Sequence, residues 1–336
     1  MKTTLAFMSL LLASTFGCSA SNDHTATQEN GFAVETDLNQ EAAAPGVIQT
    51  TTPVPSAFFS KANQQGKVER MEYTSKDYAK SSKPPTHKPV YVYLPYGYDP
   101  SLQYDVIYLI HGWGGTAQEY FGIESRPQMK NLFDNMIEQG LCKPFIAVSP
   151  TWDKDNSRKG WGESCEEASV FSQEYVNDLI PAVEGKYSTY AKTTDMEGIL
   201  ASREHRAFGG FSLGSITTWF IFEQTFPTQK YFLPMSGDNW HVEMFGGQTK
   251  PNETATFLAS LVSASPYKDN FYVWYAVGDE DSRFYQTHNQ ALAMAAIPET
   301  FNEKNFSYHQ KPGGRHDFNA VWEFCYHAIP QFFPKK

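Results

Sequence analysis

The sequence predicts an α/β fold in which a mostly parallel central sheet has helices on both faces. Short apolar runs that suit buried parallel strands recur at residues 106–110, 145–148, 206–208, 231–233, 271–277 and 306–309. Segments with helical spacing of apolar residues lie between or after these runs, at residues 176–187, 216–226, 291–296 and 321–332. Strands that alternate with helices are typical of parallel sheets. Pro181 predicts a kink in the first of these helices.

Two further strands are predicted ahead of the alternating region. Residues 68–73 and 90–94 have the composition of strands, and we expect them to pair antiparallel. The chain has 336 residues, 41% of them hydrophobic, which is enough for one large core. No internal repeat and no second boundary is evident, so residues 60–336 are predicted to form one domain.

Composition and charge exclude several classes of protein. The formal net charge of −10 argues against nucleic-acid binding, because an acidic surface repels phosphate groups. Beyond the N-terminus, no segment approaches the roughly 20 apolar residues of a membrane span. Apart from Cys18, three cysteines remain, an odd number that argues against a disulfide framework, although a bridge from Cys142 to Cys165 stays open. No Cys/His cluster has zinc spacing, so we expect no metal and no cofactor.

The first 18 residues are predicted to be an export signal. Lys2 provides a positive start, and the apolar stretch that follows it is too short to span a membrane. Cys18 follows glycine, as at the end of a bacterial lipobox, and is a candidate site for a lipid anchor; cleavage after Ala20 is the alternative. Residues 19–59 are polar and lack periodicity, which predicts a flexible tether. We therefore expect a secreted protein or one anchored at a bacterial cell surface.

The pentapeptide Gly210-Phe211-Ser212-Leu213-Gly214 carries the strongest chemical signal. It lies between a predicted strand and a predicted helix. A sharp turn at this point needs glycines because it is strained and packs closely, and it lifts the serine hydroxyl out of the sheet. The pattern predicts a nucleophilic serine. An ordinary glycine-rich turn is the alternative unless partners for the serine are found.

Candidate partners follow the last two predicted strands. A serine hydroxyl needs a histidine to take its proton and an acid to orient that histidine. In α/β-hydrolases the three occur in the order Ser, Asp, His. Ser212, Asp281 and His316 have this order and are the predicted catalytic residues. Asp279 and Asp238 remain alternative acids, since each also follows a predicted strand.

Acyl transfer also needs backbone N–H donors for the oxyanion of the tetrahedral intermediate. Leu213, directly after the serine, would supply one donor. The loop His111-Gly112-Trp113-Gly114-Gly115, which follows the first buried strand, would supply the other. We assign this second donor to Trp113, with Gly114 as the alternative. His111 itself is interpreted as a structural residue.

Together these segments resemble the signature blocks of carbohydrate esterase family 1, the esterase D-like group with bacterial feruloyl esterases and acetyl xylan esterases. The similar blocks are residues 110–115, 178–181, 209–214, 234–240, 278–281 and 313–318. The resemblance covers about residues 60–336 and implies an α/β-hydrolase fold and a metal-free enzyme that cleaves feruloyl or related esters. It maps the acid of the family onto Asp281. Arg315 stands where family members often carry glycine, which leaves the substrate preference open.

Aromatic residues in predicted loops are candidates for the substrate pocket. Trp161 and Trp240 would suit either a phenolic acyl group or a sugar ring, and Asp238 is a further candidate for substrate binding. The favoured hypothesis is a serine esterase that acts on feruloylated arabinoxylan or its oligosaccharides through an acyl-enzyme. One alternative is an acetyl xylan, siderophore-ester or other small-ester hydrolase of the same superfamily. Another is a non-catalytic protein that binds glycan, against which the intact Ser–Asp–His order argues.

Overall fold

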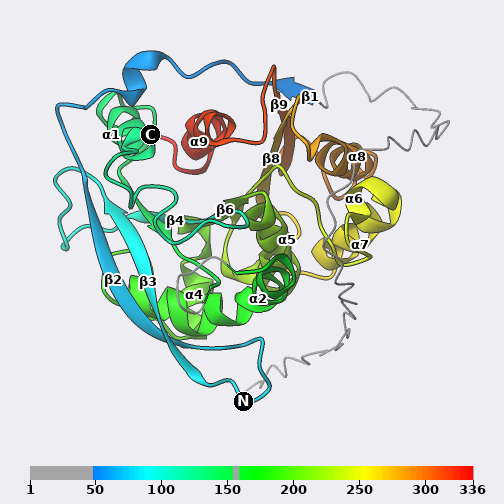
Figure 1. The fold of residues 1–336 in the computed structure, drawn as a ribbon, viewed down its shortest axis with the longest axis horizontal. Coiled ribbons are helices and arrows are strands. Elements are labelled where there is room, and N and C mark those ends of the chain that lie inside the picture. The colour runs from blue at the N-terminus through cyan, green and yellow to red at the C-terminus, as the bar shows by residue number, and fades with distance from the viewer. Residues whose placement is uncertain (1–47, 154–158, 336) are drawn as a thin grey trace, which may run out of the picture. The chain divides into compact units, whose positions relative to one another are not determined.

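The computed structural model describes residues 48–153 and 159–335. The predicted export signal, Cys18 and most of the predicted tether lie outside the described residues. Within them, a nine-stranded sheet has the order β1-β9-β8-β7-β6-β4-β5-β3-β2 (Figure 1). The strands are β1 (Ile48–Thr50), β2 (Lys67–Lys76), β3 (Pro85–Leu94), β4 (Asp105–Ile110), β5 (Phe145–Ser149), β6 (Arg206–Phe211), β7 (Tyr231–Met235), β8 (Tyr272–Gly278) and β9 (Phe306–Lys311).

Most neighbouring strands are parallel. The pairs β4–β5, β4–β6, β6–β7, β7–β8, β8–β9 and β1–β9 are parallel, whereas β3 is antiparallel to both β2 and β5. The predicted mostly parallel sheet and the predicted antiparallel pair are both confirmed. The α-helices are α1 (Gln128–Glu138), α2 (Trp161–Glu174), α3 (Ile180–Glu184), α4 (Met196–Ala201), α5 (Leu213–Thr225), α6 (Gly246–Thr249), α7 (Pro251–Ser263), α8 (Phe284–Ala295) and α9 (Phe318–Phe332).

The buried strands have apolar side chains on both faces. In β4, Val106 and Tyr108 belong to one apolar cluster, and Ile107 and Leu109 belong to another. Successive side chains of a strand point to opposite faces, so a continuous apolar run needs cover on both sides. Helices α1 and α9 cover one face, and α2, α5, α7 and α8 cover the other (Figure 1).

The fold begins earlier in the chain than the predicted boundary at residue 60. Strand β1 pairs with β9, and the 3-10 turn η1 (Ser56–Phe59) packs its rings on α9. Phe58 lies 5.1 Å from the ring of Tyr326, and Phe59 lies 5.3 Å from that of Trp322. A three-residue strand has no periodicity of its own and depends on a partner far along the chain, which explains why local composition predicted a tether here.

The helix predicted from residue 176 begins at Trp161 and changes its winding before Pro181. Helix α2 leads into a π turn, η2 (Tyr175–Leu179), and then into α3. Pro181 has no N–H to donate to the preceding turn, so a regular α-helix cannot continue through it. The π turn accommodates this interruption at the place where the sequence predicts a kink.

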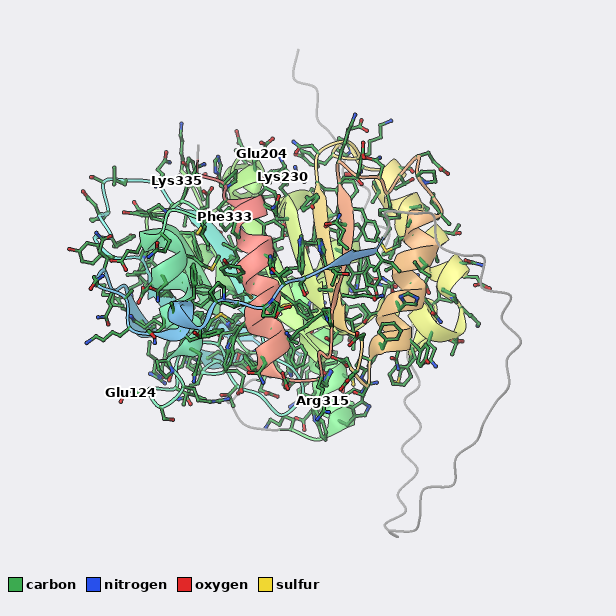
Figure 2. The ribbon with its side chains drawn as sticks, turned by 90° about the horizontal axis from the view of Figure 1, so that it is seen from above. Glu124, Glu204, Lys230, Arg315, Phe333 and Lys335 are labelled. Atoms are coloured by element: carbon green, nitrogen blue, oxygen red, sulfur yellow. The ribbon has the colours of Figure 1, made fainter. Side chains whose placement is uncertain are left out.

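The two edges of the parallel sheet differ in what they carry. Glu204 and Lys230 precede β6 and β7, whereas Arg315 follows β9, and Figure 2 shows Arg315 at the opposite end of the sheet from the other two. The loops that follow β4, β6, β7, β8 and β9 therefore gather at one edge, which we call the carboxyl edge. In open α/β sheets this edge is where ligands bind.

Two further sequence-based expectations concern cysteines and membrane spans. Cys142 is a buried free thiol, so the bridge to Cys165 that the sequence left open is not formed. Burial raises the pKa of the Cys142 thiol to about 12. No helix within residues 48–153 and 159–335 is long and apolar enough to cross a membrane.

A buried histidine makes the stability of the fold depend on pH. His309 in β9 stacks on Trp274 at 3.8 Å, and burial lowers its pKa to about 3, with His327 contributing. The unfolded chain takes up this proton near pH 6.5, whereas the folded protein does not. The free energy of unfolding should therefore fall by about 1.4 kcal/mol per pH unit as the pH drops from 6.5 towards 3.

His309→Phe keeps a ring on Trp274 but removes the titration. We expect urea unfolding at pH 7, 6 and 5 to give a smaller acid-induced loss for this variant than for the wild type, by about 1.4 kcal/mol per pH unit. Parallel pH profiles for the two proteins would contradict the assignment of His309 as a buried neutral histidine.

Candidate active site

Ser212 occupies a strained turn between β6 and α5. Its φ is 60° and its ψ is −121°, a conformation that costs a non-glycine residue about 1–3 kcal/mol. The flanking glycines permit close packing instead. A Cβ on Gly210 would lie 2.4 Å from the carbonyl oxygen of Gly214, and one on Gly214 would lie 2.4 Å from that of Ile110. The backbone strain of the turn is therefore located at Ser212, and the two glycines allow the turn to pack directly against the end of β4.

Ser212, His316 and Asp281 form one chain of hydrogen bonds. The hydroxyl of Ser212 lies 2.9 Å from Nε2 of His316, and Nδ1 of His316 lies 2.8 Å from Oδ1 of Asp281. The Asp281 side chain is fully buried, whereas 29% of the His316 side chain is exposed. The carboxylate can only accept, so Nδ1 carries the proton and Nε2 is left to accept from the serine. The three predicted residues meet in the order that nucleophilic catalysis needs.

The two alternative acids lie elsewhere. Asp279 is exposed, and its backbone rather than its side chain joins the sheet, through a bond to the carbonyl of Lys311. Asp238 is 1% exposed and accepts from Nε1 of Trp240 at 2.9 Å and from the backbone N–H of Gly247 at 2.8 Å. Burial raises the pKa of Asp238 to about 6. It holds the Trp240 indole and makes no contact with the imidazole of His316.

The loops that carry Asp281 and His316 are fastened to each other. A Cβ on Gly278 would lie 2.2 Å from the carbonyl oxygen of Gly314, so only glycine fits at this crossing. The backbone N–H of Glu280 donates to the same oxygen at 2.9 Å. Arg315 adds an exposed ion pair with Glu280 at 3.0 Å. These contacts set the distance between acid and base independently of the serine.

The loop after β4 lies against the nucleophile. A Cβ on Gly112 would lie 3.0 Å from Cβ of Ser212, so a side chain there would collide with the serine. Nδ1 of His111 donates to the carbonyl of Gly112 at 2.8 Å. In a trans peptide the N–H points opposite to the carbonyl, so the N–H of Trp113 points away from the His111 ring. The carbonyl of Gly112 is thus held in an orientation that frees the next N–H for another acceptor.

His111 is itself held as a neutral ring. It is fully buried, and burial lowers its pKa to about 4. Its Nε2 accepts from the hydroxyl of Thr151 at 2.8 Å, and its ring lies 4.2 Å from that of Trp152. The structure therefore agrees with the interpretation of His111 as a structural residue and shows what it supports.

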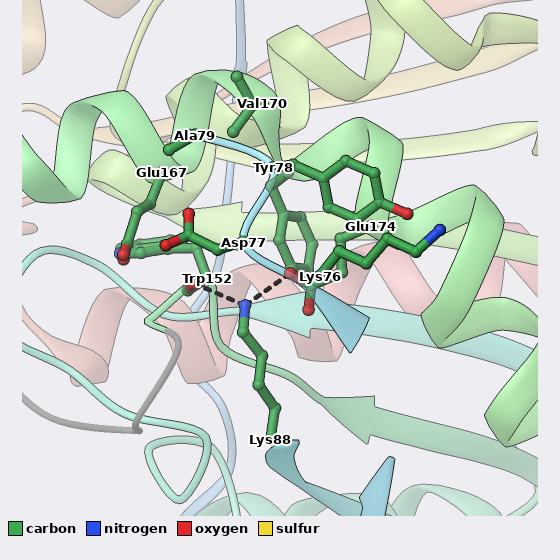
Figure 3. A pocket seen from close by; sticks show the side chains of 10 residues that line it. Lys76, Asp77, Tyr78, Ala79, Lys88, Trp152, Glu167, Val170 and Glu174 are labelled. Atoms are coloured by element: carbon green, nitrogen blue, oxygen red, sulfur yellow. Dashed lines mark hydrogen bonds and ion pairs between the residues drawn. The ribbon is translucent and has the colours of Figure 1, made fainter. Parts of the chain in front are cut away.

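A buried lysine holds the segment of Thr151 and Trp152, which in turn contacts His111. Nζ of Lys88 donates to the carbonyl of Trp152 at 2.7 Å and pairs with Glu174 at 2.5 Å (Figure 3). It also donates to the carbonyl of Thr151 at 3.3 Å. Both charged side chains are almost fully buried. Removing one partner of such a pair would leave an uncompensated charge, so the pair fixes the segment that carries Thr151.

Three tryptophans form a chain of ring contacts that starts in the loop after β4. Trp113 is 53% exposed, Trp161 is half-buried and Trp240 is 5% exposed. Trp113 and Trp161 lie 5.6 Å apart, and Trp161 and Trp240 lie 6.0 Å apart, both as edge-to-face pairs. Trp240 follows β7 in a loop, as expected, whereas Trp161 is the first residue of α2 rather than a loop residue. Trp113 has the most exposed of the three indoles, although the sequence predicted a role only for its backbone N–H.

The fold and this arrangement define a class of protein. A strained strand–turn–helix serine, bonded to a histidine that a buried aspartate orients, belongs to serine hydrolases of the α/β-hydrolase fold. Residues 81–334 match the model of the Esterase family, described as "Putative esterase". The chain belongs to this family, and the resemblance to bacterial feruloyl esterases is confirmed by a feruloyl esterase module that is 33% identical.

Both curated proteins and solved structures resemble the chain. Endo-1,4-beta-xylanase Y of Acetivibrio thermocellus is 34% identical over 287 residues, which are 84% of this chain and 24% of that protein. A mutant of the feruloyl esterase module from Clostridium thermocellum, complexed with sinapinate, has a TM-score of 0.74 and is 33% identical. The match covers 86% of this chain and 95% of that module. A ferulic acid esterase of family CE1 from Anaeromyces mucronatus has a TM-score of 0.62 and 19% identity, over 84% of this chain and 96% of that one, and supports the fold alone.

The chain spans only part of the curated relatives. It covers 24% of the xylanase of Acetivibrio thermocellus. An endo-1,4-beta-xylanase/feruloyl esterase of Xylanibacter ruminicola is 30% identical over 135 residues, which are 39% of this chain and 17% of that protein. The module of known structure, in contrast, is matched over almost its whole length. The similarity to the xylanases therefore concerns one part of each protein.

Proposed function

We propose that this protein is a serine esterase that hydrolyses feruloyl and related hydroxycinnamoyl esters of plant cell-wall xylan. The observation that carries the proposal is the Ser212–His316–Asp281 hydrogen-bond chain, in a sequence that is 33% identical to a sinapinate-complexed feruloyl esterase module. The hydrogen bonds support the reaction type. The sinapinate-bound relative supports a hydroxycinnamoyl group as the acyl part of the substrate.

Each residue of the site has a role in the proposed reaction. The hydroxyl of Ser212 attacks the ester carbonyl while Nε2 of His316 takes its proton. Asp281 keeps the other ring nitrogen protonated and stabilises the imidazolium that forms. His316 then gives the proton to the leaving alcohol, which leaves the acyl group on Ser212. A water molecule, deprotonated by His316, attacks the acyl-enzyme and releases the acid.

Two backbone donors stabilise the oxyanion in this proposal. Leu213 begins α5 directly after the nucleophile, and its N–H belongs to the first turn of the helix. The N–H of Trp113 is the second donor, because His111 holds the carbonyl of Gly112 on the opposite side of the same peptide. Donors fixed before the reaction need no reorganisation as the charge develops, and each contributes about 10²–10³ in kcat.

The proposed acyl pocket is built from two of the three tryptophans described above. Trp161 and Trp240 form its aromatic wall, and Asp238 acts from behind by holding the Trp240 indole through Nε1. A flat apolar wall suits a phenolic ring. No metal or cofactor has a role in this reaction, and the substrates are feruloylated arabinoxylan or its oligosaccharides.

A panel of esters tests the proposed function. We expect the protein to hydrolyse methyl ferulate and methyl p-coumarate with a higher kcat/KM than 4-nitrophenyl acetate, since only the first two fill an aromatic pocket. Turnover of the acetate without either hydroxycinnamate would favour a small-ester or acetyl xylan esterase. No turnover of any ester, together with no labelling by a fluorophosphonate, would leave a non-catalytic glycan-binding protein.

We also propose that the protein is exported and that a tether, which ends before β1, joins the export signal to the esterase domain. Residues 1–18 would direct export, Cys18 would carry a lipid at a bacterial cell surface, and the residues that follow would tether the esterase domain. Labelling of the protein by radioactive palmitate in a bacterial host, lost in Cys18→Ser, is the expected result. Equal labelling of the two proteins would contradict the lipid site.

A further inference from the structure

A row of ring contacts runs along the carboxyl edge from the loop after β4 to the loop after β8. Trp240 lies 5.3 Å from Phe245, and the guanidinium carbon of Arg283 lies 5.3 Å from the centroid of Phe245. With the two tryptophan pairs described above, these contacts join four separate segments. We call this row the aromatic band, and it consists of Trp113, Trp161, Trp240, Phe245 and Arg283.

Large exposed apolar side chains mark the band and its borders. Trp113 at one end is 53% exposed. Tyr285, which follows the other end in the first turn of α8, is 61% exposed, and its ring lies 5.4 Å from that of Phe284. Met244, beside Phe245, is 39% exposed. Single exposed apolar residues are ordinary, but here Trp113 belongs to the row of ring contacts, and Met244 and Tyr285 flank its other end in the segments that follow β7 and β8, which indicates a binding surface.

The exposed indole is held in place before any ligand arrives. Nε1 of Trp113 donates to the carbonyl of Lys159 at 3.1 Å, and the edge-to-face contact with Trp161 restrains the same ring. A side chain that is already immobile loses little entropy when it binds. An exposed ring with these restraints is therefore suited to stacking.

The charges at this edge restrict the ligand. Asp279 and Glu280 are exposed in the loop that precedes Arg283, and Arg315 is already paired with Glu280. Glu280 and Arg315 neutralise each other and Asp279 offsets Arg283, so these four side chains offer no surplus positive charge to an acidic glycan or an anionic lipid surface, and the net charge of −10 repels both. A neutral chain of pentose rings presents flat CH-rich faces and carries no charge to be repelled. It is also the part of the proposed substrate that extends beyond the ester.

We propose that the exposed side chains along the aromatic band, Trp113, Met244 and Tyr285, bind the neutral β-linked pentose chain of the xylan that carries the ester, while Trp161 and Trp240 remain the wall of the acyl pocket. This inference rests on the proposed function and deepens it. The indole of Trp113 stacks on a sugar ring near the reacting ester, and Tyr285 and Met244 contact sugar rings farther along the chain. The band thereby adds affinity for polymeric substrate that a free feruloyl ester does not receive.

The test compares substrates with and without a sugar chain. In Tyr285→Ala, we expect the ratio of kcat/KM for a feruloylated xylan oligosaccharide to kcat/KM for methyl ferulate to fall about tenfold, through KM. The matched control is Tyr96→Ala. Tyr96 is 57% exposed and follows β3, which runs antiparallel to β5, so it lies at the opposite edge of the sheet. This control should leave the ratio at its wild-type value.

A binding measurement separates this inference from the proposed function. We expect xylohexaose, which has no ester, to bind the wild-type protein in a calorimeter and to bind Tyr285→Ala about tenfold more weakly. Binding of xylohexaose without hydrolysis of any feruloyl ester would support the band and overturn the proposed function. Hydrolysis of feruloyl esters with an unchanged substrate ratio in Tyr285→Ala and no binding of xylohexaose would overturn the band alone.

Discussion

Ser212→Ala is expected to lower kcat for methyl ferulate by about 10⁴- to 10⁶-fold while KM changes little. The substitution removes the only group that the proposed mechanism acylates, and the oxyanion donors and pocket remain in place. Alanine tolerates a φ of 60° about as poorly as serine does, so the free energy of unfolding should change by no more than about 1 kcal/mol. Steady-state kinetics and urea unfolding of both proteins measure the two effects.

The chain offers a matched control in Ser236. This serine follows β7, has a φ of 59° and is fully buried, and its hydroxyl has no hydrogen-bond partner within the described part of the chain. Ser236→Ala repeats the chemical change at a residue with a similar positive φ at the next strand end. It should retain kcat within about twofold. A folded Ser212→Ala protein with more than about 1% of wild-type kcat would rule out Ser212 as the nucleophile.

Asp281→Asn is expected to lower kcat by about 10⁴-fold with an intact fold. A neutral asparagine cannot stabilise the imidazolium that forms when His316 takes the serine proton, and this is the interaction that the carboxylate supplies. Oδ1 of Asp281 accepts both from Nδ1 of His316, at 2.8 Å, and from the backbone N–H of Arg283, at 2.7 Å, so an asparagine oxygen at this position keeps the ring orientation and only the charge is lost. The measurement is kcat for methyl ferulate, with circular dichroism to verify the fold.

Asp279→Asn is the matched control for the acid. It makes the same change in the same loop, at an exposed position that does not touch His316. We expect its kcat to stay within about twofold of the wild-type value, because a solvated surface charge has little effect on a buried hydrogen bond. Equal losses in Asp279→Asn and Asp281→Asn would mean that the loop as a whole, and not the buried carboxylate, controls the histidine.

The strands and the reacting groups could be predicted because their signals are local. An apolar run such as residues 106–110 must be buried on both faces whatever its neighbours are. Ser212 follows such a strand in a turn that glycines permit, and Asp281 and His316 follow two others. Parallel strands bring their carboxyl ends to one edge, so placement in sequence was enough to predict that the three side chains meet.

Features that depend on distant partners could not be predicted. Helix α2 buries polar residues such as Ser164 and Glu174, the latter paired with Lys88 from β3, so it shows no apolar stripe. Strand β1 exists only through its pairing with β9. The hydrogen bond from Thr151 to His111 joins two loops that are far apart in the sequence, although a polar residue directly after the apolar strand β5 was a signal that could have been used.

In the proposed mechanism, Ser212 carries the hydroxycinnamoyl group during turnover. The most direct measurement is mass spectrometry of the protein after brief mixing with methyl ferulate and an acid quench, followed by peptide mapping. We predict one feruloyl group per molecule, attached to Ser212, which appears before steady-state release of ferulate. Turnover without any adduct, or an adduct on a peptide that lacks Ser212, would contradict the account.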